Sequence, residues 1–219
     1  MARKDAPVAV LAGTPVDTEM GAKVLRAHGL SPINCPVSYH PLEQASFQVK
    51  SPEEKRGILG RILRQAMEQG CESALIYCNS LSGAVDFSAL SSELRLPIVT
   101  PMDAYREIAP SWSRLAVIAY NGQALAGIDT AMVRMNPNLL LQPAGVPQVT
   151  LDIESGLAPE EIIRRNHLDA LLHYFEACGC EALVIGCTHF PYLTEALRRF
   201  TKLPLLDPAE TMIRLLLEA

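Results

Sequence analysis

The sequence contains one segment twice, and this duplication limits the folds open to the chain. GCESALIYCNS (residues 70–80) aligns without a gap on GCEALVIGCTH (residues 179–189), which pairs Cys78 with Cys187 at an offset of 109 residues. Two further pairs align at an offset of 107 residues: LPIVTP (96–101) on LPLLDP (203–208), and AVLAG (9–13) on AVIAY (116–120). Because this interval is much longer than a solenoid repeat, we expect two similar lobes rather than a repeat array.

Short apolar runs mark the predicted strands. They do not alternate with polar residues and are bounded by loop residues, as expected for parallel strands that are covered on both faces. The runs are residues 7–13, 73–78, 96–101, 114–120, 182–187 and 203–208. Helical patterns lie between them, so the sequence predicts an α/β fold with two similar parallel-sheet α/β lobes, related as a pseudo-twofold duplication.

Two helices carry boundary signals in the sequence. Ser51 and Glu54 form a predicted capping box at the start of the first helix, and Gly70 is its expected stop. The second is predicted as one helix over residues 158–178, with Pro159 near its start and Gly179 after its end.

The predicted lobes cover residues 1–100 and 101–207. A helix over residues 208–219 is expected to pack back onto the first lobe. Lobes of this size can bury a core without disulfides.

Composition argues against several classes of protein. The net charge of −5, with no basic cluster, argues against a nucleic-acid partner. No apolar stretch reaches the roughly 18 residues of a membrane span. The N-terminal segment MARKDAPVAVLAG has only a short apolar run, so we expect no secretory signal, a cytoplasmic protein and six reduced cysteines.

Cys78 and Cys187 are predicted to follow equivalent strands, at the carboxyl edge where open α/β sheets bind ligands. Two thiols facing one cleft between the lobes could act on opposite faces of one carbon, because a thiolate removes a proton and a thiol returns one. A free thiol has a pKa of about 8.5, so a modest shift makes both forms accessible near neutral pH. The helix start that follows each cysteine would favour the thiolate.

Polar residues beside the two cysteines are candidate binding groups. Asn79, Ser80 and Thr188, with backbone N–H groups at the following helix starts, are suited to hold a substrate carboxylate. His189 could donate a proton to the Cys187 thiol or hold the substrate. The alternative is that His189 only caps the next helix.

The two cysteine segments carry a family resemblance. YCNSLS (77–82) and GCTHFPYL (186–193) resemble the signature segments of the cofactor-independent aspartate/glutamate racemase superfamily, and the second is most similar to glutamate racemase. The resemblance extends from the first strand to LLDPAE (205–210), nearly the whole chain. It implies two similar α/β domains with the active site between them, no pyridoxal phosphate, no metal and an association into homodimers.

By position in those segments, the resemblance gives Cys78 and Cys187 the catalytic roles. One cysteine would remove the proton from the α-carbon of an amino acid and the other would return it. His189 would assist in catalysis, while Asn79, Ser80 and Thr188 would bind the substrate.

Two loops depart from the glutamate racemase pattern. An Asp-Ser pair usually follows the first strand, whereas this chain has Ala12, Gly13 and Thr14 there. Thr14 is then a candidate binding residue and Asp17 a candidate substitute for the missing aspartate; the alternative is that both are turn and capping residues. In the second lobe Asn121 stands in for a threonine-containing loop and is a further candidate for substrate binding. Residues 35–44 stand near the place of the family's Pro-Tyr-Gly substrate loop.

Other residues have structural interpretations. Cys71 and Cys180 precede their strands and are expected in the core. Cys178, Cys180, Cys187 and His189 are not expected to share a metal ion. Seven extended residues between Cys180 and Cys187 span about 23 Å, whereas zinc needs its sulfur ligands about 2.3 Å away. Glu154 is either a second-lobe carboxylate or part of an ordinary loop.

Three functional hypotheses follow. The first is an amino acid racemase or epimerase for an acidic or similarly polar amino acid. The second is another enzyme of the same fold, such as a decarboxylase or a cis-trans isomerase. The third is a non-catalytic protein that binds a small ligand, for which the missing Asp-Ser pair is the main support.

Overall fold

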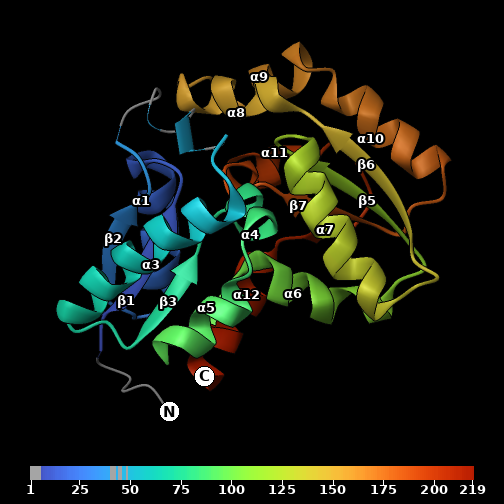
Figure 1. Ribbon diagram of the computed structural model, residues 1–219. Helices are drawn as coiled ribbons and strands as arrows, with labels where there is room; N and C mark the ends of the chain where they lie inside the picture. Colours follow the sequence, from blue (N-terminus) through green and yellow to red (C-terminus); the bar gives the residue numbers. More distant parts are fainter. Residues whose placement is uncertain (1–5, 40–42, 44–45, 48) are drawn as a thin grey trace. The chain divides into compact units, whose positions relative to one another are not determined.

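The computed structural model describes residues 6–39, 43, 46, 47 and 49–219. The chain divides into two compact units: Met1–Ala104 with Ala209–Ala219, and Tyr105–Pro208. Each unit is built around its own parallel sheet (Figure 1). In the described part of the chain, no helix is long and apolar enough to cross a membrane.

The first unit has a four-stranded sheet in the order β2-β1-β3-β4. Its strands are β1 (Val8–Ala12), β2 (Pro32–Pro36), β3 (Ser73–Ile76) and β4 (Ile98–Val99). All neighbours pair in parallel, and Leu11 of β1 lies opposite Ile76 of β3. The carboxyl ends of β1 and β3 therefore meet at one edge of the sheet.

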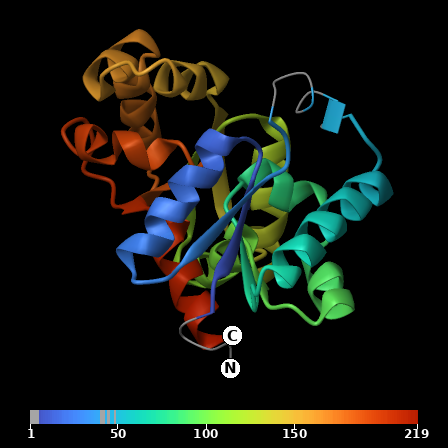
Figure 2. The ribbon, with the colours of Figure 1, turned by 90° about the vertical axis from the view of Figure 1, so that its left-hand side faces the viewer.

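Helices cover both faces of this sheet (Figure 2). Ala9 and Leu11 pack with residues of α3 (Pro52–Glu68) and α5 (Phe87–Leu94). Val8 and Val10 pack with residues of α1 (Pro15–Ala27) and α12 (Pro208–Glu218). Burial on both faces explains why the β1 sequence is apolar throughout instead of alternating. Two further helices of the described residues are α4 (Asn79–Ala84) and α6 (Pro101–Ile108), and α6 runs into the second unit.

The second unit repeats the same strand order, β6-β5-β7-β8. Its strands are β5 (Arg114–Ala119), β6 (Leu140–Gly145), β7 (Ala182–Gly186) and β8 (Leu205–Leu206), again all parallel. Its helices are η1 (Ala109–Ser111), α7 (Gly122–Met135), α8 (Pro147–Glu154), α9 (Pro159–Arg165), α10 (Leu168–Ala177), η2 (Phe190–Leu193) and α11 (Thr194–Leu197). The duplication predicted from the sequence is confirmed, because β3 and β7 occupy equivalent places.

The capping box at the start of α3 is confirmed. The Ser51 side chain accepts a hydrogen bond from the Glu54 N–H, and the Glu54 carboxylate accepts one from the Ser51 N–H. Gly70 follows the helix with φ of 93°, a left-handed conformation that glycine adopts without a Cβ penalty.

The single helix predicted over residues 158–178 is wrong, because the chain forms α9 and α10 with a break between them. His167 at the break has φ of 51°, in the left-handed region. The Asn166 amide donates to the Asp152 carboxylate (2.8 Å) and to the Ile162 carbonyl (2.9 Å). A tertiary partner on α8 therefore stabilises the helix end.

Candidate active site

In the first unit the structure places Cys78 just beyond the carboxyl end of β3. It is the N-cap residue of α4, and its carbonyl accepts hydrogen bonds from the Ser82 hydroxyl (2.7 Å) and the Ser82 N–H (3.1 Å). The Cys78 Sγ lies 3.4 Å from the Ser80 Oγ. The half-buried thiol is thus presented at the sheet edge beside a hydroxyl, with Asn79 buried in the first turn of α4.

Thr14 lies at the same edge, because β1 pairs with β3. It is the N-cap of α1, and its Oγ1 accepts a hydrogen bond from the Asp17 N–H at 3.4 Å. Asp17 is therefore the third residue of the helix, where a carboxylate is favoured by the helix dipole. The alternative that Asp17 is the N-cap is wrong, because Thr14 occupies that position.

In the second unit Cys187 follows β7 directly and is buried. Its Sγ lies 3.7 Å from the Nδ1 of His189 and 3.8 Å from the Oγ1 of Thr150 on α8. The thiol therefore has two polar partners, one from its own loop and one from a helix 37 residues earlier in the chain.

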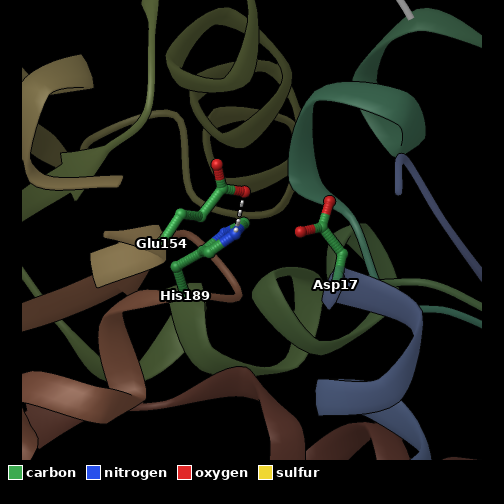
Figure 3. A group of neighbouring side chains, drawn as sticks. All are labelled: Asp17, Glu154 and His189. Atoms are coloured by element: carbon green, nitrogen blue, oxygen red, sulfur yellow. Dashed lines mark hydrogen bonds and ion pairs between the residues drawn. The ribbon is translucent and has the colours of Figure 1, made fainter. Parts of the chain in front are cut away.

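The His189 ring joins Cys187 to a carboxylate. Its Nε2 lies 3.2 Å from the Oε1 of Glu154 (Figure 3). His189 is the N-cap residue of η2 but makes no side-chain capping bond, so the alternative that it only caps the helix is wrong. Glu154 is the last residue of α8, not part of an irregular loop.

Two further predicted binding residues lie near this edge of the second sheet. Asn121 follows β5 and caps α7, its Oδ1 accepting from the Ala124 N–H at 3.0 Å. Thr188 is half-buried between Cys187 and His189. Thr14 and Asn121 therefore occupy equivalent capping positions after the first strand of each unit.

Gly186 allows β7 to lie close to its neighbours just before Cys187. A Cβ at this position would lie 2.7 Å from the Ile118 carbonyl oxygen and 2.8 Å from the Ile128 Cδ1. Both separations are shorter than real Cβ contacts, and the first involves backbone that cannot rotate away. The residue before the thiol is thus fixed by the packing of β5 and α7.

No protein-family profile matches this chain, but individual relatives do. The glutamate racemase of Ralstonia nicotianae is 28% identical over 182 residues, covering 78% of this chain and 62% of the relative. The glutamate racemase of Symbiobacterium thermophilum is 26% identical over 149 residues, covering 66% and 53% respectively. The matched part thus spans between half and two thirds of these relatives' length.

Solved structures match over nearly the whole chain. Glutamate racemase from Francisella tularensis, in complex with D-glutamate, superposes with a TM-score of 0.75 at 19% identity, over 99% of this chain and 82% of that one. An aspartate racemase homologue from Pyrococcus horikoshii superposes with a TM-score of 0.72 at 16% identity, over 99% of this chain and 98% of that one. Allantoin racemase from Klebsiella pneumoniae superposes with a TM-score of 0.67 at 19% identity, over 98% of this chain and 87% of that one. The chain is thus similar in sequence to glutamate racemases and has the two-lobe fold of the aspartate/glutamate racemase superfamily.

Three of the other cysteines, Cys35, Cys71 and Cys180, are buried and structural. Burial raises the pKa of Cys35 to about 11, and it also raises the pKa of Cys71 and of Cys180. A raised pKa keeps these thiols protonated and unreactive, which agrees with the core positions predicted for Cys71 and Cys180. Of the segment 35–44, residues 40–42 and 44 lie outside the described residues.

Thr150 was not predicted as a site residue from the sequence. Its spacing of four residues from Glu154 was a usable signal, because residues i and i+4 of a helix share one face. That signal requires the helix α8 to be recognised first, whereas residues 152–156 have the composition of an ordinary loop.

Proposed function

We propose that this protein is a cofactor-independent amino acid racemase in which Cys78 and Cys187 act as the two acid/base groups. The observation that carries the proposal is the equivalence of the two thiols. Each follows the third strand of its unit, at the sheet edge where parallel α/β sheets bind ligands, and each has a hydroxyl within reach of its sulfur.

The proposed reaction needs no group beyond these side chains. One cysteine, as the thiolate, takes the proton from the α-carbon and leaves a carbanion that the substrate carboxyl group stabilises. The other cysteine, as the thiol, gives its proton to the opposite face of that carbon. Each turnover inverts the stereocentre and exchanges the protonation states of the two sulfurs, so the reverse reaction restores them.

Cys187 has the contacts that acid/base work requires. The His189 Nδ1, at 3.7 Å, can share a proton with the thiol, and Glu154 holds the ring from its other nitrogen. For Cys78 the corresponding support is the Ser80 hydroxyl. Asn79, Ser80 and Thr188 are proposed to hold the substrate carboxylate, with Thr14 and Asn121 as further binding residues.

The proposed substrate is an acidic or similarly polar amino acid. Relatives by sequence are named glutamate racemase, and one structural match holds D-glutamate. A structural match to an allantoin racemase shows that a cyclic substrate belongs in the same test.

The test is solvent deuterium uptake at the α-carbon, followed by NMR without added cofactor. The panel contains L- and D-amino acids and, separately, the enantiomers of allantoin. We expect exchange with inversion for a polar amino acid. Exchange with allantoin alone would overturn the amino acid assignment, and no exchange with any compound would favour the ligand-binding alternative.

Single substitutions test the two-base mechanism. Cys78→Ala and Cys187→Ala should each abolish inversion of the substrate found in the panel while the circular dichroism spectrum stays unchanged. Cys178→Ala is the matched control, because Cys178 is half-buried at the end of α10, and it should keep wild-type turnover. Near wild-type turnover in either of the first two variants would contradict the mechanism.

A further inference from the structure

We propose that Thr150 is a positioning residue that stabilises the thiolate of Cys187 through its hydroxyl. This inference rests on the proposed role of Cys187. It concerns a residue of α8 that neither cysteine segment contains.

The contact is buried and specific. Thr150 and Cys187 are each 7% exposed, and their Oγ1 and Sγ atoms are 3.8 Å apart. A threonine inside a helix often bonds to the carbonyl four residues earlier. Among the described residues, the sulfur of Cys187 is instead the partner of this hydroxyl.

Two residues of α8, Thr150 and Glu154, lie on the side of the helix that faces the Cys187 loop. Thr150 and Glu154 are four residues apart, so they lie on one face of the helix. Thr150 contacts the sulfur directly, whereas Glu154 reaches it only through His189. Val149 and Ile153 are buried in the same helix, and their packing holds this face toward the Cys187 loop.

The two partners of the sulfur have different chemistry. The His189 Nδ1 can take or give a proton, depending on its tautomer. The Thr150 hydroxyl does not titrate in this range and can always donate its O–H. A hydrogen bond donated to the charged form of an acid stabilises that form, and charge-assisted bonds are stronger than neutral ones. Thr150 therefore favours the thiolate without competing for the proton.

The charged groups around the sulfur within this unit are few. His189 contacts it, and Glu154 contacts His189. Asp152 is on the same helix, but its carboxylate accepts bonds from Gln148 and Asn166 and lies near Arg165. A change at Thr150 alters none of these charges, so its effect can be separated from theirs.

The experiment is the pH dependence of alkylation of Cys187 by iodoacetamide, read by peptide mass spectrometry on the full chain. In Thr150→Val, which keeps the shape but lacks the hydroxyl, we expect the midpoint of the profile to move up by about one pH unit. Thr150→Ala should move it in the same direction, and Thr150→Ser should restore the wild-type midpoint. The Ala variant keeps the test intact if the Val variant fails to fold.

Two controls separate this effect from general damage. Cys178 in the same samples should keep its own profile, because it is in the same unit but is not a partner of Thr150. Thr130→Val, an exposed position on α7, should leave the Cys187 profile unchanged. A shift of the Cys178 profile in Thr150→Val, or of the Cys187 profile in Thr130→Val, would mean a structural disturbance and would overturn the inference.

The outcomes are independent of racemase activity. An unchanged Cys187 midpoint in Thr150→Val and Thr150→Ala would overturn the inference. If buried Cys187 is not alkylated at any pH, the same midpoint is read from the ultraviolet absorbance of its thiolate, as the difference between each protein and its Cys187→Ala form, and no such absorbance at any pH would also overturn the inference. A shifted midpoint in a protein that inverts no substrate would support Thr150 and count against the proposed function alone.

Discussion

His189 has a partner at each ring nitrogen, and this fixes its orientation. Cys187 lies at Nδ1 and Glu154 at Nε2, while the ring itself is buried. A buried imidazole with one carboxylate partner is held in a single orientation, as in other acid/base sites. Glu154 acts on the thiol only through this ring, so the two residues should behave as one unit.

The residue-scale prediction follows from that coupling. His189→Asn should lower the rate of inversion by about 10²-fold, the scale of general acid/base catalysis. Glu154→Gln should lower it less, and the double variant should lose no more than His189→Asn alone. Rates of inversion measured by polarimetry check this. Glu160→Gln, which removes a carboxylate paired with Arg199 on the surface, should stay within about twofold of wild type.

If the rate losses of His189→Asn and Glu154→Gln multiply in the double variant, the coupling of His189 and Glu154 is contradicted. Independent effects would mean that Glu154 contacts the substrate or another group directly, and not only through His189.

At the scale of elements, the end of α1 is tied to α12 within the first unit. The His28 Nδ1 lies 2.9 Å from the Val24 carbonyl oxygen, and its Nε2 lies 3.3 Å from the Glu210 carboxylate. The Val24 carbonyl, with a smaller contribution from Glu210, raises the pKa of His28 above its usual 6.5 against an opposing effect of burial. A cation is also favoured at the C-terminus of a helix.

The element-scale prediction is a pH-dependent contribution to stability. Because the folded pKa is raised, protonated His28 contributes its full stability below pH 6.5, and this is lost as the pH rises through the folded pKa. His28→Gln should therefore lower the free energy of unfolding more at about pH 5.5 than at about pH 8.5. Urea unfolding at the two pH values measures the difference.

Glu210→Gln is the companion variant, and it should remove part of the pH dependence but not all. An equal destabilisation by His28→Gln at both pH values would show that the charge of His28 makes no contribution.

At the scale of the whole molecule, the chain leaves the first unit and then returns to complete it. The last eleven residues belong to the first unit, where Met212, Ile213 and Leu216 of α12 pack with Val8 and Val10 of β1. Chain segments about 200 residues apart in the sequence thus share one core. The stability of the first unit should then depend on the C-terminal helix.

Two residues of α12 differ in burial and should therefore differ in their contribution to stability. Ile213 is 2% exposed and Leu217 is 48% exposed. Ile213→Ala should lower the free energy of unfolding by about 2–5 kcal/mol, whereas Leu217→Ala should change it by less than about 0.5 kcal/mol. Urea unfolding followed by circular dichroism gives both values. Similar losses in the two variants would mean that α12 contributes helix propensity rather than a buried face.

Much of the fold was predictable from local patterns, and the exceptions share a cause. The apolar runs located β1, β3, β4, β5, β7 and β8. The central strands β1, β3, β5 and β7 are almost entirely apolar because they are covered on both faces. Two edge strands, β2 and β6, were missed. They are partly exposed and contain Pro32, Pro36 and Pro143, residues tolerated at sheet edges but not typical of strands.

By itself the sequence determined the duplicated α/β units and the position of each cysteine after an equivalent strand. These properties depend on residue order, apolar pattern and helix caps, all of which are local. Only the tertiary structure decided that α8 brings Thr150 and Glu154 to Cys187 and His189, and that α9 ends where Asn166 meets Asp152. Such contacts join residues 14 to 37 positions apart, and they form because buried side chains such as Val149 and Ile153 pack in one arrangement.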